Sequence, residues 1–484
     1  MHMQWKEYVT AHRGDMKAAS RAYRSAGRST DLNDVSLLSS TPVARVVYPE
    51  TISDVQRVVK ESSIVCVRGT AHSMGGHTLW PHATCIDTAR MTSVQVRRND
   101  VVVGPGVSWH ALLFALDAKG RTVTCMQSYA DFSVGGSVSV NAHGPTTDVL
   151  VNSVKAFVIV LADGRRVTCS RSAHRDLFES AIGGYGLLGI IVSITLSTRP
   201  NTLLRQKSFA DALPLSKLLA WYDAQRRDRK VCMYTVRAAT TGKNAFSEAV
   251  AIAWEDTSVA AELGTHPLRR AGSIQQVMNT LQRATLSTSI GVWIAKKVMT
   301  TRGERDIDSA ANTDVRLSMN QMRYQLCEYV TPHAHSPHTF LLFESFLARS
   351  TMLRFLADVR RTLTGVASDA FGPIFLLSLY IRFVEPDTTT RLAYAPDERV
   401  SFVFYFKVAR DHASEYDSVC RHLVGATLRH GGCFYLPYRV CFTCEQLRSA
   451  YPHVSTFMHT KRKYDPRGKF ASWFAKRVEQ CALG

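Results

Sequence analysis

Residues 64–76 read Ile64-Val65-Cys66-Val67-Arg68-Gly69-Thr70-Ala71-His72-Ser73-Met74-Gly75-Gly76, an apolar run of strand length that stops abruptly in a loop of small residues. A buried strand that leads into such a loop brings the backbone close to a ligand, because glycine has no side chain and adopts conformations that other residues avoid. Free backbone N–H groups in loops of this kind bind anions. The stretch therefore predicts a strand followed by a binding site for a phosphate-bearing molecule.

Two more glycine-rich segments follow along the chain. Residues 132–144 are small almost throughout, and residues 183–191 contain four glycines before an apolar strand. The run from Gly184 to Gly189 has the spacing of a dinucleotide-binding turn, but it leads into a strand instead of a helix, so by itself it indicates a tight packing turn. The three segments together, each next to a strand, indicate one site for an anionic cofactor.

Alternating strands and helices are expected over the rest of the chain. A helix is expected over residues 53–61, with Ser53 as its N-cap, and another over 109–119, with Gly120 just past its end. Beyond residue 201 the strands become longer, and the order of elements suggests a second α/β lobe. There we expect helices near 270–300, 350–364 and 412–430, and strands at 339–347, 374–384 and 401–408.

The composition is that of a packed globular protein. Of 484 residues, 45% are hydrophobic and only 20% are charged, which excludes a disordered chain and predicts two or three lobes. No apolar stretch approaches the ~18 residues that a membrane span requires. The N-terminus also lacks the residue pattern of a secretory signal. We therefore expect a cytoplasmic or other intracellular protein with no integral membrane segment.

Eleven cysteines are scattered over the chain, an odd number that argues against a disulfide framework. The single Cys-x-x-Cys pair, Cys441 and Cys444, has no second pair of ligands at the spacing that structural zinc needs. We expect reduced, mostly buried thiols and no metal site.

A formal net charge of +19 favours phosphate-bearing partners, whether nucleic acid, lipid or small substrate. The arginines are spread along the chain, only residues 461–469 are locally dense, and no nucleic-acid-binding pattern accompanies them. We expect a solvated basic surface, no nucleic-acid partner, and a small-molecule substrate that is either neutral or anionic. No feature of the sequence indicates the oligomeric state.

The order of the glycine-rich segments resembles the vanillyl-alcohol oxidase or PCMH type of FAD-binding fold. The first loop is similar to that of cytokinin dehydrogenases, in which Arg-Gly-x-x-His-Ser carries the histidine joined to the flavin. Residues 432–435, 447–452 and 462–470 are similar instead to aldonolactone and alditol oxidases and to decaprenylphosphoryl-ribose oxidase. The resemblance covers residues 40–478.

This resemblance implies an α+β protein in four parts. They are an N-terminal helical segment (1–39), a two-lobed FAD-binding domain (40–200), a substrate or cap domain with an antiparallel sheet (201–440), and a C-terminal segment that returns to the FAD domain (441–484). It also implies FAD attached covalently through His72. The alternative is a loop histidine beside a non-covalent flavin, because the decaprenylphosphoryl-ribose enzymes lack a histidine here.

The resemblance further implies the residues that surround FAD. His77 lies past the first loop and is expected to be solvated or one layer removed from the cofactor. The residues expected to contact FAD are Arg68, Gly69, Thr70, Ala71, His72, Ser73, Met74, Gly75, Ser128, Tyr129, Ser133, Val134, Gly135, Gly136, Asn141, Ala142, His143, Ile190 and Tyr435.

Three residues beyond the FAD loops are candidates for catalysis. Strand alternation puts Glu344 on one face with Leu342 and Phe346, where a carboxylate is costly unless it is paired. Arg382 projects from the semi-polar side of an otherwise apolar strand. The related oxidases have a catalytic lysine where this chain has Tyr438, and a phenol with an ordinary pKa of ~10 is a poor base.

Together these features predict an FAD-linked oxidase or dehydrogenase that acts on a CH–OH donor. The expected reaction is oxidation of a sugar, polyol or aldonolactone hydroxyl by hydride transfer to flavin N5, with oxygen or another electron acceptor as the final oxidant. Oxidation of an amine or of a phosphate-linked sugar is the alternative. A flavin-binding protein that lost catalysis together with the lysine is a third interpretation.

Overall fold

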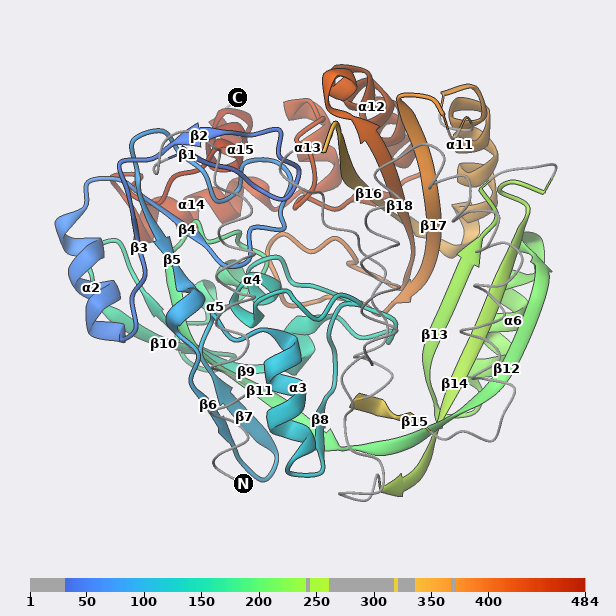
Figure 1. The fold of residues 1–484 in the computed structure, drawn as a ribbon, viewed down its shortest axis with the longest axis horizontal. Helices are drawn as coiled ribbons and strands as arrows, with labels where there is room; N and C mark the ends of the chain where they lie inside the picture. The colour runs from blue at the N-terminus through green and yellow to red at the C-terminus, as the bar shows by residue number, and fades with distance from the viewer. Residues whose placement is uncertain are drawn as a thin grey trace.

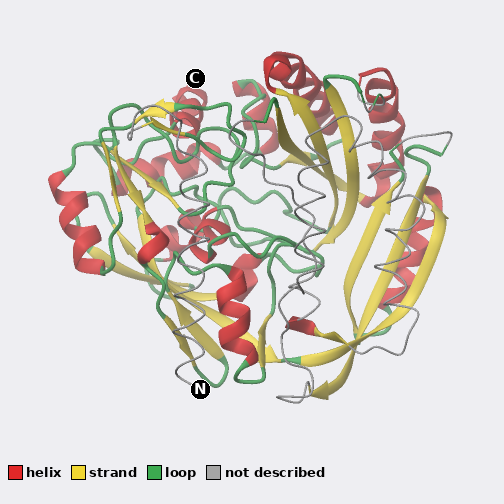
Figure 2. Ribbon diagram, in the orientation of Figure 1, coloured by secondary structure: helices red, strands yellow, loops and turns green. Residues whose placement is uncertain are grey.

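Three larger sheets and one two-stranded sheet form in the part of the chain that the structure describes, and the three larger ones organise the fold. The structure is a computed structural model, and it describes residues 31–240, 244–260, 317–320, 336–366, 369 and 371–483. Helices and mostly antiparallel sheets make it a mixed α+β protein, as expected (Figures 1 and 2). Within the described ranges, no helix combines the length and apolar character needed to cross a bilayer.

The smallest of the three larger sheets has three parallel strands and contains the strand predicted before the first glycine-rich loop. Its order is β3 (Arg45–Val47), β5 (Thr84–Asp87) and β4 (Val65–Arg68). Helix α2 (Ile52–Glu61) packs against it through Val55, Val58 and Val59. The N-cap of α2 is Thr51, in a capping box with Asp54, so the prediction of Ser53 was wrong: the threonine two residues earlier can pair reciprocally with an acidic residue at N3.

A six-stranded antiparallel sheet follows. Its order is β10 (Arg166–Ser170), β9 (Val154–Val160), β11 (Ile190–Pro200), β7 (Asp100–Val103) and β6 (Val94–Val96), with β8 (Arg121–Val123) paired to the far end of β11. Three short helices accompany it: α3 (Trp109–Asp117), α4 (Val134–Ser139) and α5 (Arg175–Ala181). Part of the small-residue segment 132–144 is therefore helical.

An eight-stranded antiparallel sheet occupies the other side of the molecule (Figure 1). Its order is β15 (Leu317–Ser318), β12 (Thr202–Pro214), β14 (Glu248–Ala260), β13 (Val231–Ala238), β17 (Ile374–Val384), β18 (Arg399–Ala409), β16 (His338–Ala348) and β19 (Cys433–Phe434). Helices α6 (Leu218–Arg226), α11 (Met352–Val366) and α12 (Ala413–Arg429) cover its outer face (Figure 1). The predicted helices at 350–364 and 412–430 are confirmed, whereas the one near 270–300 lies outside the described residues.

The C-terminal residues pack against the small parallel sheet. They form α13 (Cys444–Ala450), α14 (Val454–Tyr464) and α15 (Trp473–Leu483). Val65 of β4 donates its N–H to the carbonyl of Lys469 (2.8 Å) and accepts from Ala471 (3.0 Å). At the other end, residues 1–30 of the expected N-terminal helical segment lie outside the described residues, and 31–39 contain β1 (Asp31–Leu32) and a turn instead of a helix. β1 pairs with β2 (Thr41–Pro42).

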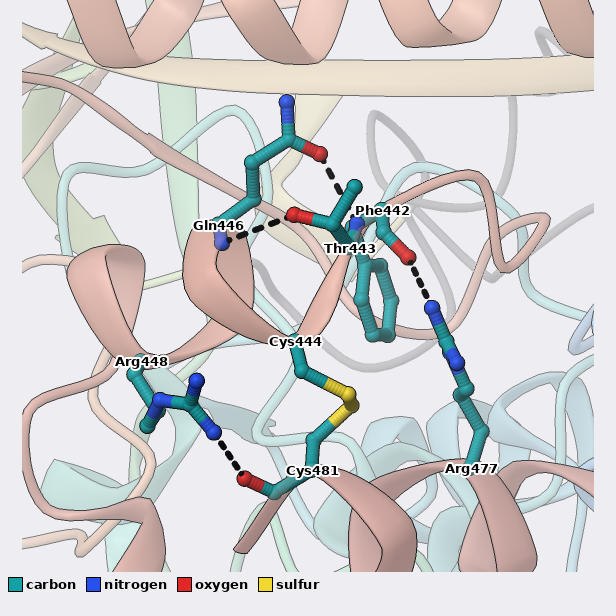
Figure 3. Close-up of a disulfide and its surroundings, with 7 residues drawn as sticks. All are labelled: Phe442, Thr443, Cys444, Gln446, Arg448, Arg477 and Cys481. Atoms are coloured by element: carbon teal, nitrogen blue, oxygen red, sulfur yellow. Dashed lines mark hydrogen bonds between the residues drawn. A yellow bond between two sulfur atoms is a disulfide. The ribbon is translucent and has the colours of Figure 1, made fainter. Parts of the chain in front are cut away.

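A disulfide joins two of the C-terminal helices. Cys444 at the start of α13 is bonded to Cys481 in α15, 37 residues later (Figure 3). The expectation that every thiol is reduced was therefore wrong. The pairing depends on how α13 and α15 lie against each other, which the spacing of cysteines along the chain does not reveal. The Cys-x-x-Cys pair is split, because Cys441 remains a buried free thiol.

Candidate functional site

A groove lies where the glycine-rich segments meet. It is lined by residues from the end of β4, the first loop, α4 and the start of β11. Its lining residues are Val67, Arg68, Gly69, Ser73, His77, Thr78, Thr88, Pro105, Gly135, Gly136, Ser139, Val140, Tyr185, Gly186, Gly189, Ile190 and Ile191. The prediction that segments between positions 68 and 190 form one site is thereby confirmed at the level of geometry.

Close packing of two loops makes glycine necessary at this groove. A Cβ atom on Gly69 would lie 2.2 Å from Oγ of Ser133, which itself accepts a hydrogen bond from Gly136 as the N-cap of α4. Gly186 has a φ of +74°, in the left-handed region, and its Cβ would lie 2.7 Å from Val67. Side chains at these positions would push the loops apart.

Three buried polar atoms of the groove's lining residues make no hydrogen bond within the described part of the chain: Nε of Arg68, Nδ1 of His77 and Oγ1 of Thr78. Nε of Arg68 lies 3.7 Å from Oδ2 of Asp87, within ion-pair distance. Buried polar atoms without a partner are uncommon in folded proteins, and they mark places where a ligand group binds. Together with the close-packed glycines, they make the groove suitable for the polar phosphate and ribose groups of FAD. The residues present therefore fit this cofactor.

The groove contains only part of the predicted set. Six of the predicted residues line it: Arg68, Gly69, Ser73, Gly135, Gly136 and Ile190. The predicted set omits Tyr185, Gly186 and Gly189, although they belong to the third glycine-rich segment, and nothing in the sequence marks Thr88 or Pro105. His77 also lines the groove. It is 5% exposed and stacks on Phe474, so the expectation of a solvated side chain was wrong.

Several other predicted cofactor residues hold the loops in place. Thr70 accepts a hydrogen bond from the N–H of Ser133, and Met74 donates its N–H to Pro437. The side chain of Asn141 is used within the protein: its amide donates to Asp387 and its carbonyl oxygen accepts from Val151. Ala71, Val134 and Ala142 are buried, and a Cβ on Gly75 would lie 2.7 Å from the carbonyl oxygen of Tyr438.

The side chain of His72 lies in an aromatic environment beside the groove. Its ring is 4.5 Å from that of Phe132 and 5.5 Å from that of Tyr129. Burial lowers the pKa of His72 to about 4, so the imidazole is neutral at physiological pH. A neutral imidazole has a nucleophilic lone pair, which covalent attachment to a flavin requires.

A second group of polar side chains surrounds Glu344 on β16. The carboxylate is 2% exposed; Oε1 contacts Nε2 of His143 at 2.7 Å and accepts a short hydrogen bond from Ser401. Burial alone would raise the pKa of Glu344, but His143, Ser401 and Arg382 together bring it below its ordinary value of 4.5. The structure thus holds a buried, ionised carboxylate.

Tyr438 completes this group. Its hydroxyl donates to Oε2 of Glu344 at 3.3 Å. Desolvation and the neighbouring carboxylate raise the pKa of Tyr438 well above its ordinary value, so the phenol keeps its proton. At this position the chain therefore has a hydrogen-bond donor to Glu344, and Glu344 is the ionised, proton-accepting member of the pair.

Three predicted cofactor residues contact Glu344 or Arg382 and are not among the lining residues of the groove: His143, Tyr435 and Ser128. The His143 ring is enclosed by Phe346, Tyr394 and Tyr435, at 5.4, 5.6 and 5.9 Å between ring centroids. The hydroxyl of Tyr435 donates to the carbonyl of Val140 at 2.8 Å. Ser128 was predicted to line the cofactor site, but its hydroxyl accepts from Arg382 at 2.7 Å, on the eight-stranded sheet. His143 therefore connects the second glycine-rich segment directly to the carboxylate of Glu344.

Comparison with known proteins agrees with this geometry. A family model described as an FAD binding domain matches residues 43–170, which contain the first two glycine-rich segments. Residues 43–170 therefore form an FAD-binding domain of the PCMH type. The suspected family and the need for FAD are thereby confirmed, while the covalent bond at His72 and the individual roles of the site residues stay predictions.

The relatives of this FAD-binding chain are oxidoreductases of two kinds. It is 30% identical to L-gulonolactone oxidase of Mus musculus over 26% of this chain and 29% of that protein. It is 29% identical to D-arabinono-1,4-lactone oxidase of Yarrowia lipolytica over 31% of each chain. Cytokinin dehydrogenase 9 of Oryza sativa subsp. japonica is 26% identical over 36% of each chain. The chain spans about a third of the length of these curated relatives.

Proposed function

We propose that the chain is an FAD-dependent oxidoreductase that oxidises a hydroxyl of a sugar, polyol or aldonolactone-like substrate. In this proposal residues 40–200 bind FAD, residues 201–440 form a substrate-binding domain around the eight-stranded sheet, and residues 441–484 return to the FAD domain. When bound, FAD supplies a two-electron acceptor that takes the carbinol hydrogen as hydride at N5.

The observation that carries the proposal is the buried, ionised carboxylate of Glu344. A hydroxyl group loses its proton when its carbon is oxidised to a carbonyl, so a positioned base is needed. Glu344 can accept that proton at Oε2, the oxygen that Tyr438 contacts. His143 and Ser401 hold the other oxygen and fix the orientation of the carboxylate. The resemblance to the two lactone oxidases supports a CH–OH donor.

The function is tested by anaerobic reduction of the purified protein. We expect a flavin absorption spectrum that bleaches on addition of sorbitol, glucose or gluconolactone, and not on addition of secondary amines. Bleaching by amines alone would move the assignment to an amine oxidase, as the similarity to cytokinin dehydrogenase allows. If no donor bleached the flavin spectrum, the chain would be a flavin-binding protein without catalytic turnover. A colourless protein that does not take up FAD would overturn the proposal altogether.

We propose in addition that His72 forms the covalent bond to FAD. The His72→Ala variant is expected to bind FAD without attachment, since the groove residues remain in place. Acid precipitation should then leave the yellow colour in the supernatant, whereas the wild-type pellet stays yellow. His422→Ala, which removes an exposed histidine on α12, serves as the matched control. A yellow pellet from His72→Ala would assign the attachment to another residue.

The loop packing at Gly69 gives a separate prediction for FAD binding. Gly69→Ala puts a methyl group on the Ser133 hydroxyl, which must rotate out of its N-cap position at a cost of about 1 kcal/mol. We expect the purified variant to contain less FAD per polypeptide than the wild-type protein, because fewer chains take up the cofactor, and we expect the FAD content to recover when Ser133→Gly is added. Gly365→Ala is the control, because its methyl group would meet no atom within 4 Å. Full FAD retention by Gly69→Ala would show that the two loops need not touch.

A further inference from the structure

Arg237 lies on the inner face of the eight-stranded sheet. Its strand neighbours Tyr234 and Val236 point the other way, where Tyr234 packs against Tyr222 of α6 at 4.9 Å. Because successive side chains of a strand alternate between faces, Arg237 projects away from α6. Directly opposite on β17 is Tyr380, and the Arg237 guanidinium lies 5.8 Å from the centre of its ring. The arginine is therefore on the side of the sheet that carries Glu344.

A row of polar side chains crosses this face from β13 to β16. Arg382 lies two residues along from Tyr380 and faces Ser401 on β18, whose hydroxyl binds Glu344. The four strands involved lie side by side in the sheet (Figure 1). Arg382 also reaches Ser128, and the N–H of Tyr234 bonds to the carbonyl of Pro145. The row therefore lies against residues of the FAD-binding domain.

Among the side chains that these four strands contribute to this face, positive charge exceeds negative charge. Within these four strands, all of whose residues the structure describes, Glu344 is the one carboxylate. The strand register puts three cationic side chains on the same side of the sheet as Glu344: Arg237, Arg382 and Lys407. Arg237 forms no ion pair with any described residue and contacts the ring of Tyr380. Arg237 and Arg382 are diagonal cross-strand neighbours, which places their Cα atoms about 7–8 Å apart. Guanidinium groups on neighbouring side chains repel each other, and an anion bound between them removes this repulsion.

We propose that Arg237 and Arg382 bind an anionic group of the substrate, a carboxylate or a phosphate monoester, with Tyr380 between them. The inference rests on the proposed function for the position of the reacting hydroxyl at Glu344. Neighbouring strands are about 4.8 Å apart, so Arg237 lies about 14 Å from Glu344 across the sheet and Arg382 about 10 Å. A sugar acid or sugar phosphate with its anionic group at one end places the opposite end of its carbon chain near the carboxylate. The substrate class is thus an anionic sugar derivative.

Binding is measured on the FAD-loaded protein, independently of turnover, by the change in the flavin spectrum. Gluconate, glucose 6-phosphate and sorbitol are titrated under anaerobic conditions, and the two anions distinguish a carboxylate from a phosphate site. Charge-assisted hydrogen bonds contribute enough free energy that Arg237→Gln should weaken binding of the preferred anion by about 10- to 100-fold. The loss of affinity for sorbitol in the same variant should be smaller. The decisive quantity is therefore the ratio of the loss of anion affinity to the loss of sorbitol affinity.

Two further variants make the result interpretable. Arg237→Lys keeps the charge and should recover part of the anion affinity, which separates loss of charge from misfolding. Arg229→Gln removes an exposed arginine outside the strand and should change nothing. The anion site would be overturned if the wild-type protein bound sorbitol and both anions with equal affinity, or if Arg237→Gln lost the same factor of affinity for all three. Either result would leave the oxidoreductase assignment intact. Anion binding that depends on Arg237 without reduction of the flavin by any donor would support the site and overturn the proposed reaction.

Discussion

Glu344→Gln should lower kcat/KM for the hydroxyl donor by about 10²- to 10⁴-fold while FAD remains bound, because the variant removes the base but no residue of the groove. Glutamine has nearly the shape of glutamate, and its carbonyl oxygen can still accept from Ser401 or Tyr438. It cannot take up the proton that leaves the substrate. The measurement is the rate of anaerobic flavin reduction, with the flavin content of each preparation determined from its absorption spectrum.

The control for this substitution is Glu255→Gln. Glu255 is also a buried, ion-paired glutamate of the eight-stranded sheet, but its partners are Arg205 and Lys207. We expect Glu255→Gln to leave the reduction rate unchanged. If Glu344→Gln reduced flavin as fast as the wild-type protein, Glu344 would not be the base, and the buried carboxylate would have only a structural role.

The pH dependence follows from the same carboxylate. The pKa of Glu344 lies below its ordinary value of 4.5, so the group is ionised throughout the neutral range. Loss of the reduction rate through protonation of Glu344 is therefore expected only below about pH 4.5. Because the pKa of Glu344 is lower in the folded than in the unfolded protein, the ionised carboxylate also stabilises the fold at pH values above its unfolded-state pKa. This stabilisation is lost as the pH falls through the folded-state pKa of Glu344.

The sequence was most informative where one strand determines the position of a side chain. Alternation along 339–347 grouped Glu344 with Leu342 and Phe346, and alternation along 374–384 put Arg382 on the semi-polar side of its strand. The register of β16, β17 and β18 puts both residues on one face of the sheet, next to Ser401. The glycine-rich segments likewise predicted a groove, because glycine at several loop positions has few explanations other than close approach of backbones. In both cases the signal is local.

Contacts between distant segments were not predictable. His143 and Glu344 are 201 residues apart in sequence, and Glu344 and Ser401 are 57 apart, so no spacing along the chain indicates that they meet. Ser401 is one of many serines, and only the pairing of β18 with β16 and β17 gives it a role. The disulfide was missed for the same reason, since its two cysteines come together only when two helices pack.

Removal of this disulfide is expected to have the largest effect on stability. The Cys444→Ser/Cys481→Ser double variant should lose about 3–5 kcal/mol of unfolding free energy, because the cross-link no longer restricts the unfolded chain across the intervening loop. Hydrogen bonds from Arg448 to the carbonyl of Cys481 (2.6 Å) and from Arg477 to that of Phe442 (2.8 Å) still join the helices (Figure 3). The native fold should therefore persist at low temperature.

The loss of stability should also affect the FAD groove, because Phe474 of α15 stacks on His77 with 4.3 Å between the ring centroids. We expect the surroundings of the flavin to unfold at a lower temperature in the double variant than in the wild-type protein, with the melting curves of the two proteins followed by flavin and by tryptophan fluorescence. Added dithiothreitol provides the matched control: it should lower the melting temperature of the wild-type protein toward that of the double variant and leave the variant unchanged. If dithiothreitol shifted both proteins equally, or neither, the cross-link between α13 and α15 would not be what holds α15 against the groove.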